Sequence, residues 1–591
     1  MSENPPSDSV GPAEPIGLPI GIDDFRALRE QGLTYVDKTH LICELIDRAG
    51  AQVVLLPRPR RFGKSLALST LRYFFDRQGD DLGHLFDDLA VWRAGERYRA
   101  HFRRYPVIHL GFKDLERERW DDLQWAMREK IRDLFDEHRA VLDAGAPGAL
   151  ERERFDSILD GSAPPGLYQR ALRDLTRALH RAHGEKVVLL IDDCDLPVHA
   201  GHAHGYGREV LAFFRGLFTA GLEGNPHLAR AVLTGVTGTV RESVFSGPSN
   251  VATYTLLRSE FSTCFGFTES EVDTLLARSG QQAEQTAPDT RATPGARDPR
   301  DERAMDERAM IDRWYGGYRF GQHTIYNPAS VLSFLADPRA RARPYWLQNG
   351  SRDLAYHVLA REISGQGPGE AAGQNADTSA DETRGLRPLL EALLAGEPVA
   401  CALGESVALD RLEHSRDALW SLLVFCGWLR AVERPPGARA ASELPVHALS
   451  IPNREVDLLL RSLLAEQPAI APARPVPAAA HPHEAGPREV PIQAQSREDI
   501  EPGPDDGPDD DLLQQRRAHV AGMARRERDQ ARPLPERRPD IVADAAAFEE
   551  RLQRFFEEMR ANPDTRSSTA PADDGAAPGA DEPAAAGRTS G

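Results

Sequence analysis

A Gly-Lys-Ser tripeptide at residues 63–65 follows an apolar run and precedes a segment with helical spacing of apolar residues. A strand, a turn and a helix, in that order, are the setting of a phosphate-binding loop. Gly63 lets the backbone approach a phosphate closely, and the amides at the helix start point at the anion. We therefore predict that Lys64 contacts the β- and γ-phosphates of a nucleotide and that the Ser65 hydroxyl ligates Mg²⁺.

The whole turn is expected to surround the phosphates. Its predicted nucleotide-binding residues are Arg60, Arg61, Phe62, Gly63, Lys64, Ser65 and Leu66. The turn departs from the usual G-x-x-x-x-G-K-[ST] pattern, because Arg58 occupies the place of the first glycine and Pro59 has no N–H. Lysine usage favours the prediction, since the chain has 72 lysine and arginine residues but only five lysines. A compact ammonium fits between phosphates where a planar guanidinium does not. A basic surface turn before a helix is the alternative.

Two acids end a second apolar run. Residues 187–191 are all aliphatic, which is typical of a central parallel strand buried on both faces. Asp192 and Asp193 follow, at the strand edge where ligands of open α/β sheets bind. We predict that Asp192 holds Mg²⁺ and that Asp193 is the general base that polarises an attacking water. An acidic strand end without a metal is the alternative.

Thr234 lies near the end of a further β-rich run, residues 228–236. If this strand lies between the other two, the Thr234 hydroxyl is expected to contact the γ-phosphate or its attacking water and to take part in catalysis. Glycines and hydroxyl residues at 234–250 indicate a mobile loop. Arg241 in this loop is either an arginine that acts on a neighbouring subunit or a solvated surface residue.

These side chains need a sheet to position them. Strands are predicted at 52–56, 105–110, 186–195 and 228–236, separated by helical patterns that include a long charged stretch at 114–182. This order predicts an α/β fold, a phosphate-loop NTPase core with a parallel sheet, followed by a mostly helical C-terminal extension and disordered tails. His109 is expected to be a strand residue with a hydrogen-bond partner rather than a ligand.

Composition shifts divide the chain further. We predict a disordered start (1–17), the nucleotide-binding domain (18–278), a linker or insert (279–310), the extension (311–466), a disordered segment (467–540), a helix (541–560) and a disordered tail (561–591). Within the extension, residues 365–384 form a low-complexity insert. Residues 422–429 and 446–451 are expected to pair as a hairpin, and Asn453 is expected to cap the next helix.

The composition limits the partners of this 591-residue chain. The formal charge of -19 argues against general coating of nucleic acid but leaves a local basic groove open. Five cysteines without C-x-x-C spacing indicate reduced thiols in a cytoplasm rather than disulfides or a zinc site. The first residues do not resemble a signal peptide, and the apolar run at 418–429 is too short to span a bilayer. We expect a cytoplasmic protein with no membrane partner.

Several segments, in order along the chain, together resemble a bacterial family of AAA-ATPase-like proteins that often carry a C-terminal PD-(D/E)XK-type nuclease domain. The segments are 18–25, 35–39, 58–65, 190–197, 233–236, 245–247, 265–268, 317–320 and 326–328. The resemblance implies ATP as the nucleotide, and the arginine-rich turn looks like that family's own phosphate loop. In the family the acidic strand usually ends Asp-Glu-Tyr-Asp. Asp193 and Cys194 replace the second and third residues here, which affects the prediction of hydrolysis more than that of binding.

A nuclease of that type needs an acid and then an acid-x-lysine on a neighbouring strand to hold Mg²⁺ and activate water. No lysine follows Lys186, and no strand-like run follows Ile451. The helical pattern at 545–559 is similar to the segment that would precede the nuclease. We therefore expect a family member whose nuclease domain is missing or truncated, without nuclease activity of its own.

The sequence thus predicts an ATP-binding protein that hydrolyses ATP to ADP and phosphate with Mg²⁺ and couples this reaction to a conformational change. One alternative is a nucleotide-gated scaffold or switch without hydrolysis, because Asp193 replaces a glutamate. Another alternative is the ATPase partner of a separate DNA nuclease. Beside the nucleotide, we consider a second copy of the chain or another protein as a partner, while the net charge gives nucleic acid no support.

Overall fold

The computed structural model describes residues 17–144, 148–238, 250–286, 299–337, 341–346, 354–364, 386–405, 409–412, 415–433 and 446–466. All of them belong to the first of two compact units, Met1–Pro472. Several predictions lie outside the described residues. These are the disordered segments at 1–16, 467–540 and 561–591, the helix at 541–560, the insert at 365–384, and Arg241.

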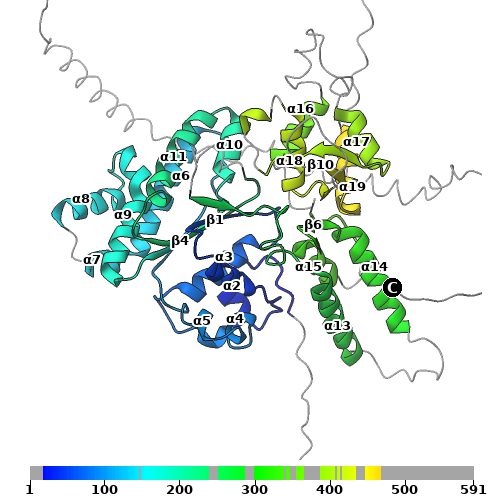
Figure 1. Cartoon of the computed structure of the whole chain (residues 1–591), viewed down its shortest axis with the longest axis horizontal. Coiled ribbons are helices and arrows are strands. Elements are labelled where there is room, and N and C mark those ends of the chain that lie inside the picture. The colour runs from blue at the N-terminus through cyan, green and yellow to red at the C-terminus, as the bar shows by residue number, and fades with distance from the viewer. Residues whose placement is uncertain are drawn as a thin grey trace, which may run out of the picture. The chain divides into compact units, whose positions relative to one another are not determined.

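Five parallel strands form the sheet at the centre of this unit (Figure 1). They are β1 (Val53–Pro57), β2 (Val107–Gly111), β3 (Val187–Asp192), β4 (Leu228–Gly235) and β5 (Val251–Thr253). Their order across the sheet is β2-β3-β4-β1-β5, with every pairing parallel. β1 and β3 are buried along their whole length, which explains their uninterrupted aliphatic sequences. The predicted α/β fold with a parallel sheet is confirmed, and β4 lies between the two strands that carry the candidate site.

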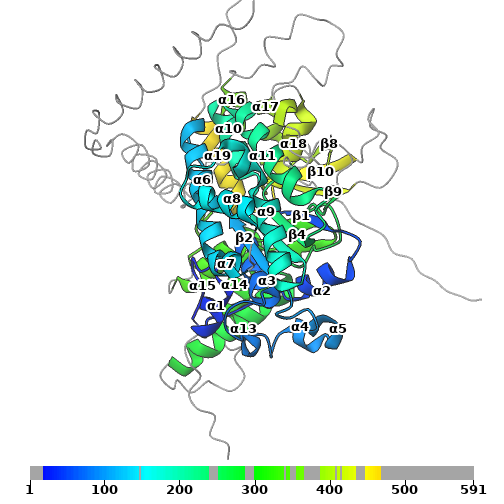
Figure 2. The ribbon, with the colours of Figure 1, turned by 90° about the vertical axis from the view of Figure 1, so that its left-hand side faces the viewer.

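Helices connect the strands and cover the sheet. They are α1 (Phe25–Glu30), α2 (His40–Asp47), α3 (Lys64–Phe75), α4 (Ala90–Arg93), α5 (Glu96–Arg99), α6 (Trp120–Glu137), α7 (Arg139–Ala144), α8 (Ala149–Leu159), α9 (Pro165–His183), α10 (Leu196–His204) and α11 (Gly207–Leu222). Figure 1 shows α2 and α3 on one side of β1 and β4 and α9 and α11 on the other, and α8 and α9 face the viewer in Figure 2. Helices α6 to α9 account for the long charged stretch at 114–182.

The extension combines helices with two small antiparallel sheets. Its elements, with the helix that precedes it, are α13 (Glu269–Thr286), α14 (Pro299–Tyr315), β6 (Tyr318–Phe320), β7 (His323–Ile325), α15 (Pro328–Ala336), α16 (Leu354–Ile363), α17 (Leu386–Leu394), β8 (Val399–Ala402), α18 (Arg416–Phe425), β9 (Arg430–Glu433), β10 (Val446–Ser450) and α19 (Arg454–Glu466). β6 pairs with β7, and β10 lies between β8 and β9. None of the helices within the described ranges has the length and apolar character that crossing a bilayer requires.

The extension corrects one prediction about secondary structure. Residues 422–429 were expected to form a strand, but α18 continues to Phe425 and β10 pairs with β9 and β8 instead. A short apolar run that is buried on all sides is compatible with a strand or a helix. Here the Ser415 hydroxyl caps the helix, accepting from the Ala418 amide at 3.3 Å. The predicted cap at Asn453 is confirmed by the bond from the Val456 amide at 3.1 Å.

Two further expectations concern the stretch at 279–310 and His109. The stretch was predicted as a linker or insert; α13 runs into it from one side and α14 begins within it, so its described ends are helical. His109 was expected to have a hydrogen-bond partner; its Nε2 atom is buried without one, and a partner at the other ring nitrogen stays a prediction. Burial lowers the pKa of His109, which favours the neutral imidazole.

Candidate nucleotide-binding site

A cavity of about 800 Å³ lies at the carboxyl edge of the central sheet. Its wall contains every residue of the predicted phosphate turn, namely Arg60, Arg61, Phe62, Gly63, Lys64, Ser65 and Leu66. Asp193 and Asp195, which follow β3, belong to the same wall. The turn and the acidic strand end therefore share one cavity, whose volume is within the range of small-molecule sites.

The turn leads from β1 into the first residue of α3. Gly63 adopts a left-handed conformation, with φ of 84°, immediately before Lys64 begins the helix. Glycine populates this region without the steric cost that a side chain brings. The first amides of α3 have no carbonyl of a preceding turn to bond, so they are available to an anion at the helix start.

Arg58, which occupies the place of the first glycine of the motif, has a structural role in the turn. Its side chain is fully buried, and the guanidinium donates to the carbonyl oxygens of Pro57 and Tyr254 at 2.7 Å and of Phe261 at 3.0 Å. It also lies over two phenylalanine rings. The guanidinium thus ties the start of the turn to the segment that follows β5, and Arg58 acts as an internal anchor of the loop.

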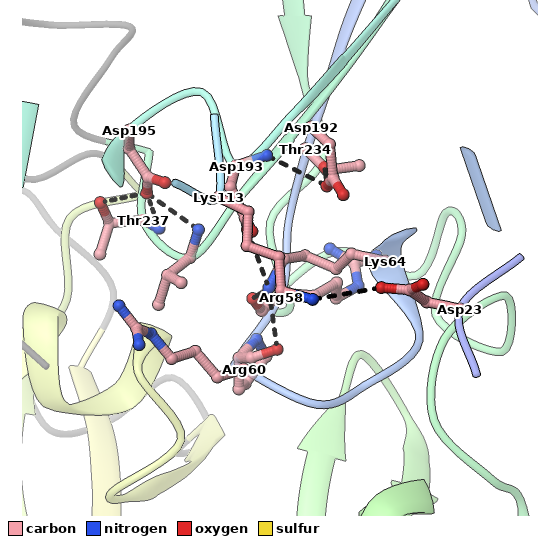
Figure 3. A network of polar contacts seen from close by, with 12 residues as sticks. Asp23, Arg58, Arg60, Lys64, Lys113, Asp192, Asp193, Asp195, Thr234 and Thr237 are labelled. Carbon is pink, nitrogen blue, oxygen red and sulfur yellow. Dashed lines mark hydrogen bonds and ion pairs between the residues drawn. The ribbon is translucent and has the colours of Figure 1, made fainter. Parts of the chain in front are cut away.

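Lys64 connects the two halves of the site. Its side chain is only 6% exposed, and its Nζ atom lies 3.3 Å from the carbonyl oxygens of both Arg58 and Pro59. The same Nζ is 3.7 Å from Oδ1 of Asp193, as Figure 3 shows. The lysine of the turn and the candidate base therefore lie within ion-pair distance.

Asp192 and Thr234 are held together behind this pair. The Thr234 hydroxyl is fully buried and donates to Oδ1 of Asp192 at 2.5 Å, and the Asp193 amide donates to the same oxygen at 3.0 Å. Thr234 therefore orients the Asp192 carboxylate (Figure 3). The expected contact of Thr234 with a phosphate or water stays a prediction.

Asp193 is placed as a strained and partly desolvated acid. Its backbone has a φ of 50°, which is uncommon for a residue with a side chain. Burial raises the pKa of the Asp193 carboxyl, and the neighbouring Asp192 adds to this effect, while Lys64 opposes it. A carboxylate with a raised pKa accepts a proton more readily than one in water, as a general base requires.

Asp195 is a site residue that the sequence predictions omitted. Its Oδ2 atom accepts from the amides of Val236 and Thr237, at 2.9 and 2.7 Å, and from the Thr237 hydroxyl at 3.0 Å. A Cβ atom on Gly235 would lie 2.7 Å from Oδ1 of Asp195, so only glycine fits there. Asp195 holds the chain that leaves β4, and its place two residues after Asp193 was the signal available in the sequence.

Apolar side chains form another part of the cavity wall. They are Pro19, Ile20, Ile22, Val36, Phe267 and Leu332, of which Val36 and Leu332 pack in one cluster with Phe267. These residues come from the chain before α1, the chain before α2, the chain between β5 and α13, and α15, which are far apart in the sequence. Lys38 and Thr39 line the cavity as well. An apolar wall beside a charged end suits a molecule with a flat ring system and an anionic tail.

The turn also contacts the extension. The Arg61 guanidinium donates to the Tyr345 carbonyl at 3.2 Å, and the Phe62 ring meets the Tyr318 ring edge-on, with centroids 4.9 Å apart. A Cβ atom added to Gly427 would lie 3.0 Å from Pro59. Three successive parts of the turn are thus packed against residues of the extension.

Glu455, at the start of α19, is a buried acid next to these contacts. Its carboxyl accepts from the Trp346 amide at 2.6 Å and from the Ser330 hydroxyl at 3.0 Å. Burial raises its pKa to about 8, while Arg61 has a weaker opposing effect. The Glu455 carboxyl is therefore mostly protonated at neutral pH.

One further group has the spacing of metal ligands. The ligand atoms of His40, Glu44 and Cys264 all lie within 4.8 Å of one another. Glu44 is already paired with Arg48 at 3.0 Å and bonded by the Cys264 thiol at 3.5 Å. Lys38 also lies close enough to influence His40 and Cys264. Because these cations supply the positive charge that an ion would bring, we assign no metal to this group.

Comparison with known proteins agrees with this geometry. Residues 19–245 match the model of the AAA-ATPase-like family, described as "Predicted AAA-ATPase". A protein of Azotobacter chroococcum mcd 1, called "Uncharacterized protein in vnfD 5'region", is 31% identical over 344 residues, which are 58% of this chain and 56% of that protein. The chain thus spans little more than half the length of this relative. No solved structure matches.

Proposed function

We propose that this chain, which carries the domain of the predicted AAA-ATPase family at residues 19–245, binds MgATP in the cavity and hydrolyses its terminal phosphoanhydride. The observation that carries the proposal is the 3.7 Å approach of Lys64 Nζ to Asp193 Oδ1 in one cavity with the whole turn. A phosphate-binding lysine and a water-activating acid must meet at one γ-phosphate, and this contact brings them together.

The chain offers complementary groups to each part of the nucleotide. The amides at the start of α3 face the phosphates, and Lys64 exchanges its carbonyl contacts for phosphate oxygens. Arg60 and Arg61 add positive charge at the same end of the cavity. The apolar part of the wall, with residues such as Ile22 and Phe267, suits the base. The choice of adenine rests on the family match.

Two oxygen donors suit Mg²⁺, which prefers carboxylate and hydroxyl oxygens. We assign the Ser65 hydroxyl, on the first turn of α3, and Oδ2 of Asp192. Thr234 and the Asp193 amide both bond Oδ1 of Asp192, so they fix the carboxylate and leave Oδ2 for the ion. When bound, Mg²⁺ neutralises charge that develops on the phosphate oxygens.

Asp193 is the proposed proton acceptor. Once Lys64 turns to the phosphates, the Asp193 carboxylate loses its neighbouring cation and becomes free to accept a proton from the attacking water. Because burial already raises the pKa of Asp193, turnover is expected to increase as the pH rises through that pKa. Hydrolysis is expected to be slow, because aspartate is one methylene shorter than the family's glutamate.

The contacts between the turn and the extension support a coupled movement. A change in the backbone of Arg61 or Phe62 on nucleotide binding would displace their contact residues in the extension, Tyr345 and Tyr318. The same contacts favour a second candidate function, a switch that binds ATP without turnover. The left-handed backbone of Asp193 supports this alternative, since it limits how the short side chain can reach a water.

The test measures MgATP affinity by calorimetric titration and phosphate release for wild type, Lys64→Ala and Asp193→Asn. Lys64→Ala is expected to weaken binding at least tenfold, since it removes a charged contact to the phosphates. Asp193→Asn is expected to retain binding and to lose phosphate release. Lys130→Ala, at an exposed ion pair with Asp114, is the control. A wild type without MgATP affinity would refute the proposal, and binding without phosphate release would support the switch.

A further inference from the structure

Lysine is concentrated around one cavity of this chain. Three of its five lysines, Lys38, Lys64 and Lys113, line the cavity. Lys38 has strong fixed partners, because its Nζ atom lies 2.7 Å from a carboxylate oxygen of Glu271 and 2.8 Å from a backbone carbonyl. Lys64 is the lysine of the phosphate turn. Neither of these roles applies to Lys113.

The backbone places Lys113 beside the acids of β3. Gly111, the last residue of β2, is the register partner of Asp192, and the Phe112 amide donates to the Asp192 carbonyl at 3.0 Å. Lys113 is the next residue. It therefore leaves the sheet at the same edge as Asp192 and Asp193, from the strand that lies on the other side of β3 from β1.

The side chain of Lys113 has a weak partner. Its Nζ atom lies 3.3 Å from Oδ2 of Asp23, in the chain before α1, and both residues line the cavity (Figure 3). The two side chains are 73% and 56% exposed. An ion pair this exposed is screened by water, so a multiply charged phosphate can replace the carboxylate at little cost.

We propose that Lys113 exchanges Asp23 for the terminal phosphate of the bound nucleotide, and that this contact makes the site distinguish ATP from ADP. The inference rests on the proposed function, because it requires a triphosphate in the turn. It adds a second lysine to the phosphate end, approaching from β2 while Lys64 approaches from α3. The freed Asp23 carboxylate then returns to water.

The experiment compares MgATP and MgADP affinities of the full-length chain by calorimetric titration for wild type and Lys113→Ala. The MgATP dissociation constant is expected to rise about tenfold and the MgADP constant less than about twofold, because ADP lacks the phosphate that Lys113 contacts. Lys130→Ala is the matched control, since its ion pair with Asp114 is also 3.3 Å long. Lys130 does not belong to the cavity wall, so both constants should stay unchanged.

Two further variants distinguish an exchange of Asp23 for the phosphate from a fixed, purely structural ion pair between Lys113 and Asp23. Lys113→Arg keeps the charge and should recover part of the lost MgATP affinity. Asp23→Asn removes the competing carboxylate and should bind MgATP at least as tightly as wild type. A loss in Asp23→Asn as large as in Lys113→Ala, or an equal loss of ATP and ADP affinity in Lys113→Ala, would overturn the inference.

The outcomes also separate this inference from the proposed function. If wild type binds MgATP and Lys113→Ala behaves like Lys130→Ala, the role of Lys113 is refuted and the nucleotide site stands. If wild type binds no nucleotide, both fail. Thermal unfolding of each variant shows whether the fold is intact. We expect an intact fold in the Lys113 variants, because the side chain is largely exposed.

Discussion

Replacing Arg58 with glycine restores the first glycine of the usual phosphate-loop pattern, and we predict that it damages the protein. Motif reasoning alone would expect Arg58→Gly to be neutral or beneficial. The structure leads to the opposite expectation, because the guanidinium bonds three carbonyl oxygens and lies 5.1 Å from the centre of the Phe265 ring. Without it, those carbonyls lose their donor and a cavity opens beneath the turn.

The size of the effect follows from these contacts. Three hydrogen bonds from a charged donor contribute about 5 to 8 kcal/mol together. Burial opposes this by lowering the pKa of Arg58 from 12.5 to about 10, which corresponds to about 3 kcal/mol. The net loss is then about 2 to 5 kcal/mol, and a mid-chain glycine adds roughly 0.5 to 1 kcal/mol through backbone entropy. We expect Arg58→Gly to lower the free energy of unfolding by about 3 to 6 kcal/mol.

The assay is urea unfolding followed by circular dichroism, together with MgATP titration under native conditions. Arg60→Gly is the control, because it makes the same substitution in the same turn, and the 3.3 Å ion pair of Arg60 with Glu116 is partly exposed. It is expected to cost less than about 2 kcal/mol. If Arg58→Gly proves as stable as Arg60→Gly, or binds MgATP more tightly than wild type, Arg58 is not the anchor that we describe.

Two other predictions concern the contacts between the turn and the extension. Glu455→Gln should become more stabilising relative to wild type as the pH rises from about 6 to about 8, by about 2 kcal/mol in urea unfolding. The reason is that burial raises the folded-state pKa of Glu455 from 4.5 to about 8, so the wild type loses stability as the pH rises through this window. A difference in unfolding free energy between the two proteins that does not change with pH would refute this prediction. Gly427→Ala should weaken MgATP binding severalfold, because the new methyl group would lie 3.0 Å from Pro59 at a residue with φ of 82°. Gly396→Ala should leave MgATP binding unchanged, because Gly396 has a similar φ of 90° but open space around it. Equal MgATP affinities of the two alanine variants would show that the contact between Gly427 and Pro59 does not affect nucleotide binding.

Several parts of the site could be predicted from local sequence. The strand, turn and helix around residues 63–65 follow from an apolar run, a glycine that tolerates a left-handed backbone, and helical spacing. The strand ending at Asp192 was predictable because five aliphatic residues are typical of a strand with both faces buried. Whether the apolar run of α18 forms a helix or a strand was not predictable, because such a run is compatible with either element.

The sequence by itself determined the strand, turn and helix that hold the candidate site residues, because backbone preferences and apolar periodicity act between near neighbours. Tertiary structure alone decided what those residues meet. The order β3-β4-β1 brings Asp193 to Lys64, and the chain beyond β5 supplies the carbonyls that hold Arg58. The pairing of Lys113 with Asp23 likewise joins segments far apart in the chain. Such contacts depend on strand order and packing, which no local pattern encodes.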